Sequence, residues 1–164
     1  MSFISLGAGC FWGVQNILSK VEGVSKTEVG YMGGHVKNPT YEQICRGDTG
    51  HAEIVRVEYD PNVVTLDTIL DYFWRLHDPT TLNRQGYDIG HQYRSVVFFH
   101  EDEQKELVEK SKDKFDASGV FEKPAVTEIE PATTFYRGEE YHQDYYLKKY
   151  QGVEGPTCHV LRSR

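Results

Sequence analysis

The sequence predicts an α+β fold, a two-layer sandwich in which helices pack on one sheet. Two strand–helix–strand units predict this fold, the first within residues 3–31 and the second within residues 52–99. A helix–strand–helix extension then occupies residues 101–150. This order of elements is typical of a split βαβ core with additions.

The first unit starts with a short apolar run at residues 3–6 that ends in a glycine turn. An apolar stripe at helical spacing begins straight after Trp12 and predicts a helix. Gly23 breaks this stripe, and residues 24–31 predict the second strand. Cys10 is therefore expected at or just before the first helical residue.

The second unit follows a long connection, residues 34–50, which carries few apolar groups. So long a connection inside a compact domain is usually functional. Apolar periodicity then predicts a strand at residues 52–59 and an amphipathic helix at residues 65–77. A second long loop, residues 78–91, leads into a strongly apolar strand at residues 93–99.

The extension begins with a charged surface helix at residues 101–118, which Gly119 stops. A fifth strand is expected at residues 125–130 and a last helix at residues 139–150. The tail, residues 151–164, has no periodicity, and we expect it to be mobile.

The length of 164 residues suits one domain, so we expect residues 1–164 to form a ferredoxin-like split βαβ core with an added C-terminal helix and irregular tail. A formal net charge of -7 argues against a general surface for nucleic acid or acidic membranes. The first positive side chain is Lys20, and the apolar start is too short for a signal peptide or a membrane span. We expect a monomeric cytoplasmic protein.

The three cysteines, Cys10, Cys45 and Cys158, are too few and too scattered for a disulfide scaffold. No CxxC pair suggests zinc, and no histidine pair has ligand spacing on one helix, so we expect no metal site. In a reducing compartment these residues are thiols that can take part in redox chemistry.

Cys10 is the first candidate for chemistry. Unpaired N–H groups and the positive end of the helix dipole favour an anion there, so its thiol should ionise more readily than a free one. A helical wheel places Trp12 off the stripe that faces the core, so an exposed indole would form the wall of a pocket beside the thiol. The alternative is a buried and inert structural cysteine.

Glu53 is the second candidate, because strand alternation places it on the same face as Val55 and Val57. A buried carboxyl group is costly unless it is paired or protonated, and burial raises its pKa. A raised pKa suits a general acid. The alternative is a strand-end carboxylate that reaches solvent or pairs with His51. Neighbouring antiparallel strands would bring Glu53 close to Cys10.

With these residues placed, the sequence resembles methionine sulfoxide reductase A over nearly its whole length. Four segments in order carry the resemblance: GCFWG at 9–13; TYE at 40–42 with GHAE at 50–53; RQGYDIG at 84–90 leading into QYRS at 92–95; and EYHQDY at 140–145. One five-residue match is weak, but four at compatible separations are specific.

The resemblance implies a role for eight residues. Cys10 is the nucleophile, Glu53 is the acid near the sulfoxide oxygen, and Cys158 is the resolving cysteine that forms a disulfide with Cys10. The others bind substrate: Phe11 and Trp12 hold its methyl group, and Tyr41, Asp88 and Tyr93 line the polar site.

It also implies an oxidoreductase that reduces the S epimer of methionine sulfoxide, free or in oxidised proteins, and so repairs proteins after oxidative stress. Thioredoxin or a small dithiol recycles the enzyme, and no further cofactor is implied. A sulfoxide oxygen leaves badly unless it is protonated, so an acid must meet the oxygen while a thiolate meets the sulfur. The resulting sulfenic acid condenses with a second thiol to a disulfide.

Two positions depart from the common family pattern. Tyr87 stands where many members have Asn, which bears on the structure of that loop. Cys158 is alone in the tail, as in members with a single resolving cysteine, so a third catalytic thiol there is excluded. Cys45 is expected to be a packed structural thiol.

Two other classes of function stay open on the sequence alone. A cysteine hydrolase would use one of the seven histidines as a base, although no nucleophile-elbow signature is present. A redox sensor would use the Cys10–Cys158 pair to switch a binding surface. In the reductase, His142 and Asp144 are expected to be structural polar partners near the rim.

Overall fold

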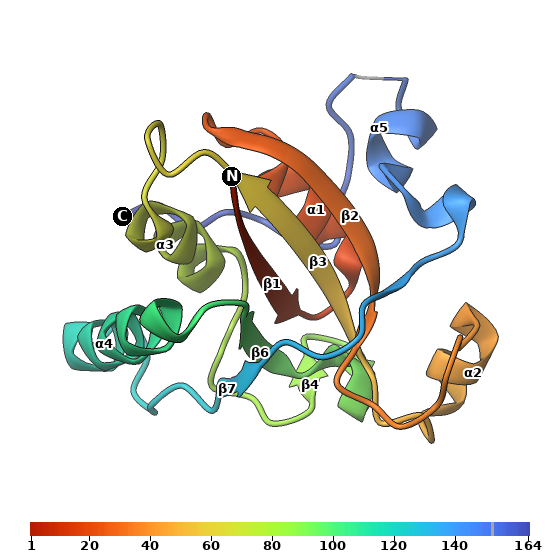
Figure 1. Ribbon diagram of the computed structural model, residues 1–164, viewed down its shortest axis with the longest axis horizontal. Coiled ribbons are helices and arrows are strands. Elements are labelled where there is room, and N and C mark those ends of the chain that lie inside the picture. The colour runs from red at the N-terminus through yellow and green to blue at the C-terminus, as the bar shows by residue number, and fades with distance from the viewer. Residues whose placement is uncertain (152) are drawn as a thin grey trace.

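The computed structural model describes residues 1–151 and 153–164, and among these six strands form one sheet in the order β7-β6-β1-β3-β2-β8 (Figure 1). The strands of this sheet are β1 (Ser2–Ala8), β2 (Val24–Met32), β3 (Ala52–Tyr59), β6 (Ser95–Phe99), β7 (Glu128–Pro131) and β8 (Tyr136–Arg137). The neighbouring strands β6, β1, β3 and β2 pair antiparallel, whereas β6 and β7 are parallel. The four central strands have the order of a split βαβ core, so the predicted fold class is confirmed.

Within the described residues, five α-helices accompany these strands. They are α1 (Phe11–Leu18), α2 (Tyr41–Arg46), α3 (Leu66–Leu76), α4 (Asp102–Ser118) and α5 (Tyr145–Lys149). Three of them, α1, α3 and α4, are the helices that the sequence predicts near residues 12–21, 65–77 and 101–118. The starts of α2 and α3 are encoded locally, since the Thr40 and Thr65 side chains accept hydrogen bonds from backbone N–H groups in the first turns of these helices. Gly119 ends α4 with a φ of 73°, a left-handed conformation that favours glycine.

The main core lies between the sheet and the helices α1 and α3. Ile4 and Leu6 of β1, Phe11 of α1 and Phe73 of α3 are almost completely buried there. The opposite face of the sheet carries a smaller apolar cluster, against which the chain before β8 packs with Phe135. Both faces of the central strands are therefore covered, which fixes their register rigidly.

The predicted helix at 139–150 is interrupted. A 3-10 turn (Glu140–His142) and the short α5 take its place, and Asp144 between them has a left-handed φ of 52°. The cause is Gln143, whose side chain bonds to the backbone of Val29 and so holds the chain against β2. Tertiary hydrogen bonds override the local helical preference here.

The long loops contain short elements that apolar periodicity does not reveal. α2 lies within residues 34–50, and the hairpin of β4 (Arg84–Gln85) and β5 (Asp88–Ile89) lies within residues 78–91. The strand expected at 93–99 begins only at Ser95, after a 3-10 turn (His91–Tyr93), and β7 begins three residues later than expected. These shifts place Tyr93 in a turn at the rim of the sheet.

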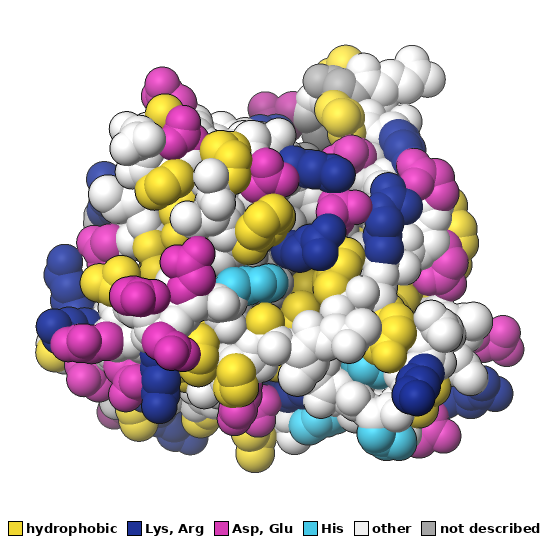
Figure 2. Space-filling model, viewed as in Figure 1, with side chains coloured by type: hydrophobic (Ala, Val, Ile, Leu, Met, Phe, Trp, Pro, Cys, Tyr) yellow, Lys and Arg dark blue, Asp and Glu magenta, His cyan; other side chains and the backbone are white. Residues whose placement is uncertain are grey.

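Acidic and basic side chains are interspersed over the face in Figure 2. No helix within the part of the chain that the structure describes is long and apolar enough to cross a membrane.

Candidate active site

Cys10 lies where β1 gives way to α1. Gly9, with a φ of 92°, makes the turn, and Cys10 is the N-cap residue of α1, as predicted. Gly13 lies one turn further along, and a Cβ atom there would lie 2.6 Å from Cys158 Sγ and overlap the His159 ring. The absence of a side chain at Gly13 therefore lets the C-terminal tail approach the thiol.

Cys158 lies beside Cys10, although 148 residues separate them in sequence. Its Sγ is 4.0 Å from the Cys10 backbone oxygen, and the two side chains share a hydrogen bond. The Cys158 N–H donates to the hydroxyl of Tyr146 at 3.1 Å. A hollow of about 590 Å³ opens beside Cys158, and Asp88 lines it as well.

The tail is fastened to the C-terminal end of α3. The Arg162 guanidinium donates to the backbone oxygens of His77, at 2.6 Å, and of Trp74, and the Arg162 N–H donates to the Arg75 oxygen at 2.9 Å. Helix-end carbonyl groups need such donors. These contacts hold Cys158 near Cys10, so the pair does not require a mobile tail; the mobility itself stays a prediction.

Glu53 is the second residue of β3 and lies near Cys10. It is on the same face of the strand as Val55, as alternation predicts. Its side chain is buried; Oε1 accepts the Phe11 N–H at 3.3 Å, and Oε2 has no hydrogen-bond partner among the described residues. Burial, with smaller effects from Asp88 and Cys158, raises the pKa of this carboxyl to about 8. The alternative of a pair with His51 is wrong, because that ring bonds to Gly34 and Val36 instead.

Each of the two thiols shifts the pKa of the other. A hydrogen bond from Cys10, followed by contact with His159, lowers the pKa of Cys158 to about 4. The pKa of Cys10 is raised by the hydrogen bond to Cys158, by burial and by the Glu53 charge. Together these effects outweigh the hydrogen bond from the Trp12 N–H, which lowers the pKa. The helix start is therefore not the only influence on the ionisation of Cys10 in the reduced protein.

Aromatic rings build one wall of the site. The sequence predicts an exposed Trp12, but its side chain is half-buried. The cause is Tyr145, which stacks on it with ring centroids 3.9 Å apart. Its indole N–H donates to Nδ1 of His142 at 2.9 Å. The Tyr41 ring stacks on Phe11 with ring centroids 6.3 Å apart, so aromatic rings gather beside Cys10.

Phenols and one further carboxyl complete the polar side. Burial raises the pKa of Tyr41 and Tyr93, with the Glu53 charge as the next cause, so both remain protonated donors. Burial and the Cys158 charge raise the pKa of Asp88. The structure thus brings the eight predicted site residues into one region.

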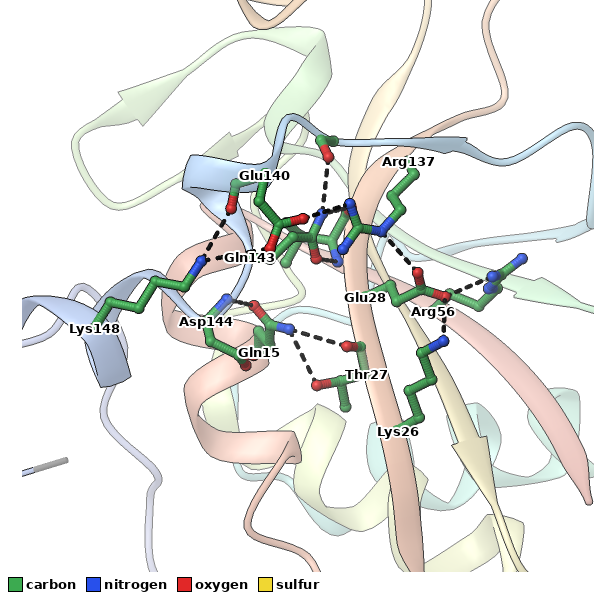
Figure 3. A network of polar contacts seen from close by, with 12 residues as sticks. Gln15, Lys26, Thr27, Glu28, Arg56, Arg137, Glu140, Gln143, Asp144 and Lys148 are labelled. Atoms are coloured by element: carbon green, nitrogen blue, oxygen red, sulfur yellow. Dashed lines mark hydrogen bonds and ion pairs between the residues drawn. The ribbon is translucent and has the colours of Figure 1, made fainter. Parts of the chain in front are cut away.

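A network of polar contacts holds the aromatic wall in place (Figure 3). Gln143 donates to the Val29 oxygen and accepts its N–H, while Gln15 of α1 accepts the Asp144 N–H at 2.8 Å. Nearby, Glu28 accepts from Arg137 and Arg56 at 2.9 Å and 2.6 Å. The segment that carries His142 and Tyr145 is therefore fixed to β2 and α1.

The family model described as "Peptide methionine sulfoxide reductase" matches residues 2–162. The chain belongs to this family. The predictions of the family and of an oxidoreductase that reduces methionine sulfoxide are thereby confirmed.

Individual relatives agree. A peptide methionine sulfoxide reductase MsrA from Methanothermobacter thermautotrophicus is 58% identical, over 96% of this chain and 91% of its own. The crystal structure of Mxr1 from Saccharomyces cerevisiae in reduced form has a TM-score of 0.88 at 38% identity, covering 98% of this chain and 92% of that one. A structure of Mxr1 in complex with Trx2 has a TM-score of 0.65 at 29% identity, covering 98% and 89%.

Three features of this reductase site have no signal in the local sequence pattern. Glu139 accepts both the Tyr31 hydroxyl and the Tyr41 N–H, at 2.8 Å and 2.9 Å, and so positions α2. Tyr145 covers Trp12, and His159 contacts Cys158. The motif EYHQDY contains Tyr145, but nothing in it indicates which ring it covers.

Cys45 differs from expectation. It is exposed on α2 rather than packed, and its thiol hydrogen-bonds with Tyr41. Burial nevertheless raises its pKa. Tyr87, at the tip of the β4–β5 hairpin, is 99% exposed, so its side chain points into solvent. No group of three or more metal-ligating side chains is found within residues 1–151 and 153–164.

Proposed function

We propose that this protein reduces the S epimer of methionine sulfoxide, free or in proteins, with Cys10 as nucleophile and Glu53 as acid. The observation that carries the proposal is the Glu53 carboxyl group, which is buried beside Cys10 with a pKa near 8. At neutral pH this group holds a proton, and one of its oxygens is free of protein partners among the described residues. A sulfoxide oxygen supplies the missing acceptor.

In the first step the Cys10 sulfur attacks the sulfoxide sulfur while Glu53 protonates the oxygen. The attack forms a bond between the Cys10 sulfur and the substrate sulfur. The hydroxyl group then passes to the Cys10 sulfur, the S–O bond and the new S–S bond both break, and methionine leaves reduced by two electrons while Cys10 remains as a sulfenic acid. Cys10 reacts as its thiolate, which is the nucleophilic form.

The neighbouring side chains bind and orient the substrate. Phe11 and Trp12 offer an apolar slot for the methyl group, which is supported by the stacked rings around them. Tyr41 and Tyr93 are fixed donors for the polarised S–O group, and Asp88 lines the polar side.

In the second step Cys158 attacks the sulfenic acid of Cys10, and a disulfide and water form. Thioredoxin or a small dithiol then reduces this disulfide by thiol–disulfide exchange. Two observations support the pairing and the reductant: the position of Cys158 beside Cys10, and the complex of the related Mxr1 with Trx2. The electrons come from thiols, so the proposal includes no metal or prosthetic group.

We further propose that residues 1–164 act as one monomeric catalytic domain in the cytoplasm, where oxidised proteins are its repair substrates. The free thiols of all three cysteines suit a reducing compartment. The net charge of -7 is unfavourable for nucleic acid and for acidic membranes.

Incubation with racemic methionine sulfoxide and dithiothreitol tests the proposal. Methionine should appear and stop at half of the racemate. A cysteine hydrolase or a pure redox sensor produces no methionine, so its absence would reject the reductase. Consumption of the whole racemate would reject selectivity for the S epimer.

A further inference from the structure

We propose that His159 is the proton acceptor for the Cys158 thiol in the step that closes the Cys10–Cys158 disulfide. The proposal rests on the function proposed above and adds a residue to it. It is carried by two contacts of one buried imidazole ring.

The first contact fixes the tautomer of the ring. Nε2 of His159 lies 2.7 Å from the backbone oxygen of Ala8, in a buried position. A carbonyl oxygen only accepts hydrogen bonds, so Nε2 must carry a hydrogen. In the neutral ring, Nδ1 then has a free lone pair.

The second contact directs that lone pair at the thiol. Nδ1 lies 3.1 Å from Cys158 Sγ, within hydrogen-bonding range for sulfur. The ring packs over Gly13, where any side chain would overlap it, and the backbone oxygen of His159 accepts from Thr157 Oγ1 at 2.8 Å. The geometry suits transfer of the thiol proton to Nδ1, with the resulting imidazolium held beside the thiolate.

The charges around the ring favour this ion pair. Cys158 and Asp88 raise the pKa of His159, opposing its burial, and His77 is kept neutral by burial with a pKa of about 3. Other titratable groups facing the Cys158 sulfur are Cys10 and Tyr146.

His159 matters most after the first chemical step. In the reduced protein the strongest stabilisation of the Cys158 thiolate is the hydrogen bond from Cys10. Formation of the sulfenic acid removes that S–H donor. The His159 contact does not depend on Cys10, so it remains to keep Cys158 ionised.

The disulfide forms by a proton transfer followed by a displacement at the Cys10 sulfur. The Cys158 S–H bond breaks and its proton passes to Nδ1 of His159. The thiolate attacks Cys10 Sγ, the S–S bond forms, and the S–O bond breaks. Sulfur of Cys158 is oxidised and sulfur of Cys10 is reduced, and the departing hydroxide takes the proton back from the imidazolium as water.

The substitution His159→Gln separates the two contacts. A glutamine amide can still donate to the Ala8 oxygen, but it has no basic nitrogen for Cys158. Without that base the thiol should titrate near the ordinary value of about 8.5. Disulfide formation should then rise about fifty-fold between pH 6.5 and 8.5 because it follows the thiolate fraction. In the parent the same rate should change less than about threefold, since the thiolate is already formed.

The decisive measurement is a titration of Cys158 by its ultraviolet thiolate absorbance and its alkylation rate, in a Cys10→Ser background. We expect a midpoint well below 8 with His159 present, and a midpoint at or above about 8 with His159→Gln. His35→Gln, an exposed histidine, is the matched control and should leave the midpoint unchanged. Circular dichroism establishes that each variant is folded.

An unchanged midpoint in the folded His159→Gln variant would overturn the role of His159. A failure of the reductase proposal can be told apart from this result. It would appear as no methionine formed by the parent protein, and it would leave the titration of Cys158 unchanged. His159→Gln should still release about one methionine per protein in a single turnover, because that step precedes the attack by Cys158. A loss there would mean that the substitution damages the first step and that His159 has a general structural role.

Discussion

Glu53 and Phe11 are joined across the active site by one hydrogen bond, from the Phe11 N–H to Glu53 Oε1 at 3.3 Å. The other carboxyl oxygen is buried and has no partner in residues 1–151 or 153–164. The backbone of α1 thus orients the carboxyl while leaving one oxygen available to a ligand. This arrangement suits an acid whose proton must be delivered to a single point.

Replacement of this acid should slow the chemical step. Glu53→Gln keeps the shape of the side chain and removes the proton, so the rate should fall by a factor on the order of a hundred or more at neutral pH. The deficit should shrink in acid, where solvent can protonate the sulfoxide. Single-turnover methionine release measures this rate. Equal rates in the parent and in Glu53→Gln at every pH would show that Glu53 is not the acid and has only a structural role.

The parent rate should also decline as pH rises through about 8, the pKa of Glu53, because the acid then loses its proton. The Gln variant has no such group and should not show this decline. A parent profile that rises steadily through pH 9 would contradict Glu53 as the acid.

The same substitution should stabilise the fold. The pKa of Glu53 is about 8 in the folded protein and about 4.3 unfolded, so the folded state binds the extra proton. Stability contributed by this group is complete below about pH 4 and is lost progressively up to about pH 8. At pH 7 Glu53→Gln should therefore gain up to about 4 kcal/mol in the free energy of unfolding. Denaturant titrations of both proteins at pH 4 and pH 7 measure this gain. A gain that is the same at both pH values would contradict a raised pKa of Glu53 in the folded protein.

Cys10→Ser should abolish reduction and leave the fold intact. A hydroxyl group stays protonated and is a poor nucleophile towards sulfur. Methionine release with dithiothreitol is the measurement, and circular dichroism is the control for folding. Turnover near the parent rate would reject Cys10 as nucleophile.

Gln143→Leu should loosen the aromatic wall. The change leaves the buried N–H of Val29 without its acceptor and removes two bonds donated by Nε2. One unpaired buried group costs about 1–3 kcal/mol, so the melting temperature should fall. Because this segment positions Tyr145 on Trp12, the KM for methionine sulfoxide should rise. An unchanged KM in the folded variant would show that the wall does not depend on Gln143.

The sequence predicts the parts of this site that depend on local order. Strand alternation puts Glu53 on the buried face, and the strand–turn–helix pattern puts Cys10 at the helix start. Both follow from contacts within a few residues along the chain.

The side-chain contacts that the C-terminal segment makes are not predicted from local order. The stacking of Tyr145 on Trp12 and the approach of His159 join segments more than 130 residues apart. The same segment explains why Trp12 is covered and why the pKa of Cys10 is raised, because Tyr145 and Cys158 both come from it.

The substitution Cys158→Ser tests the recycling step. Cys158→Ser should still release about one methionine per protein in a single turnover, because the first step needs only Cys10 and its acid. Turnover driven by thioredoxin should be lost, since thioredoxin attacks a disulfide. Dithiothreitol should still support turnover, because a small thiol can reduce the sulfenic acid.

The central claim is that Cys10 and Cys158 form the catalytic disulfide, and mass spectrometry of the oxidised parent protein tests it most directly. After one equivalent of methionine sulfoxide and proteolysis without reductant, the spectrum should contain a peptide linking Cys10 to Cys158, with Cys45 free. A Cys10–Cys45 link, or undiminished thioredoxin-driven turnover in Cys158→Ser, would contradict the account and make the exposed Cys45 the resolving thiol.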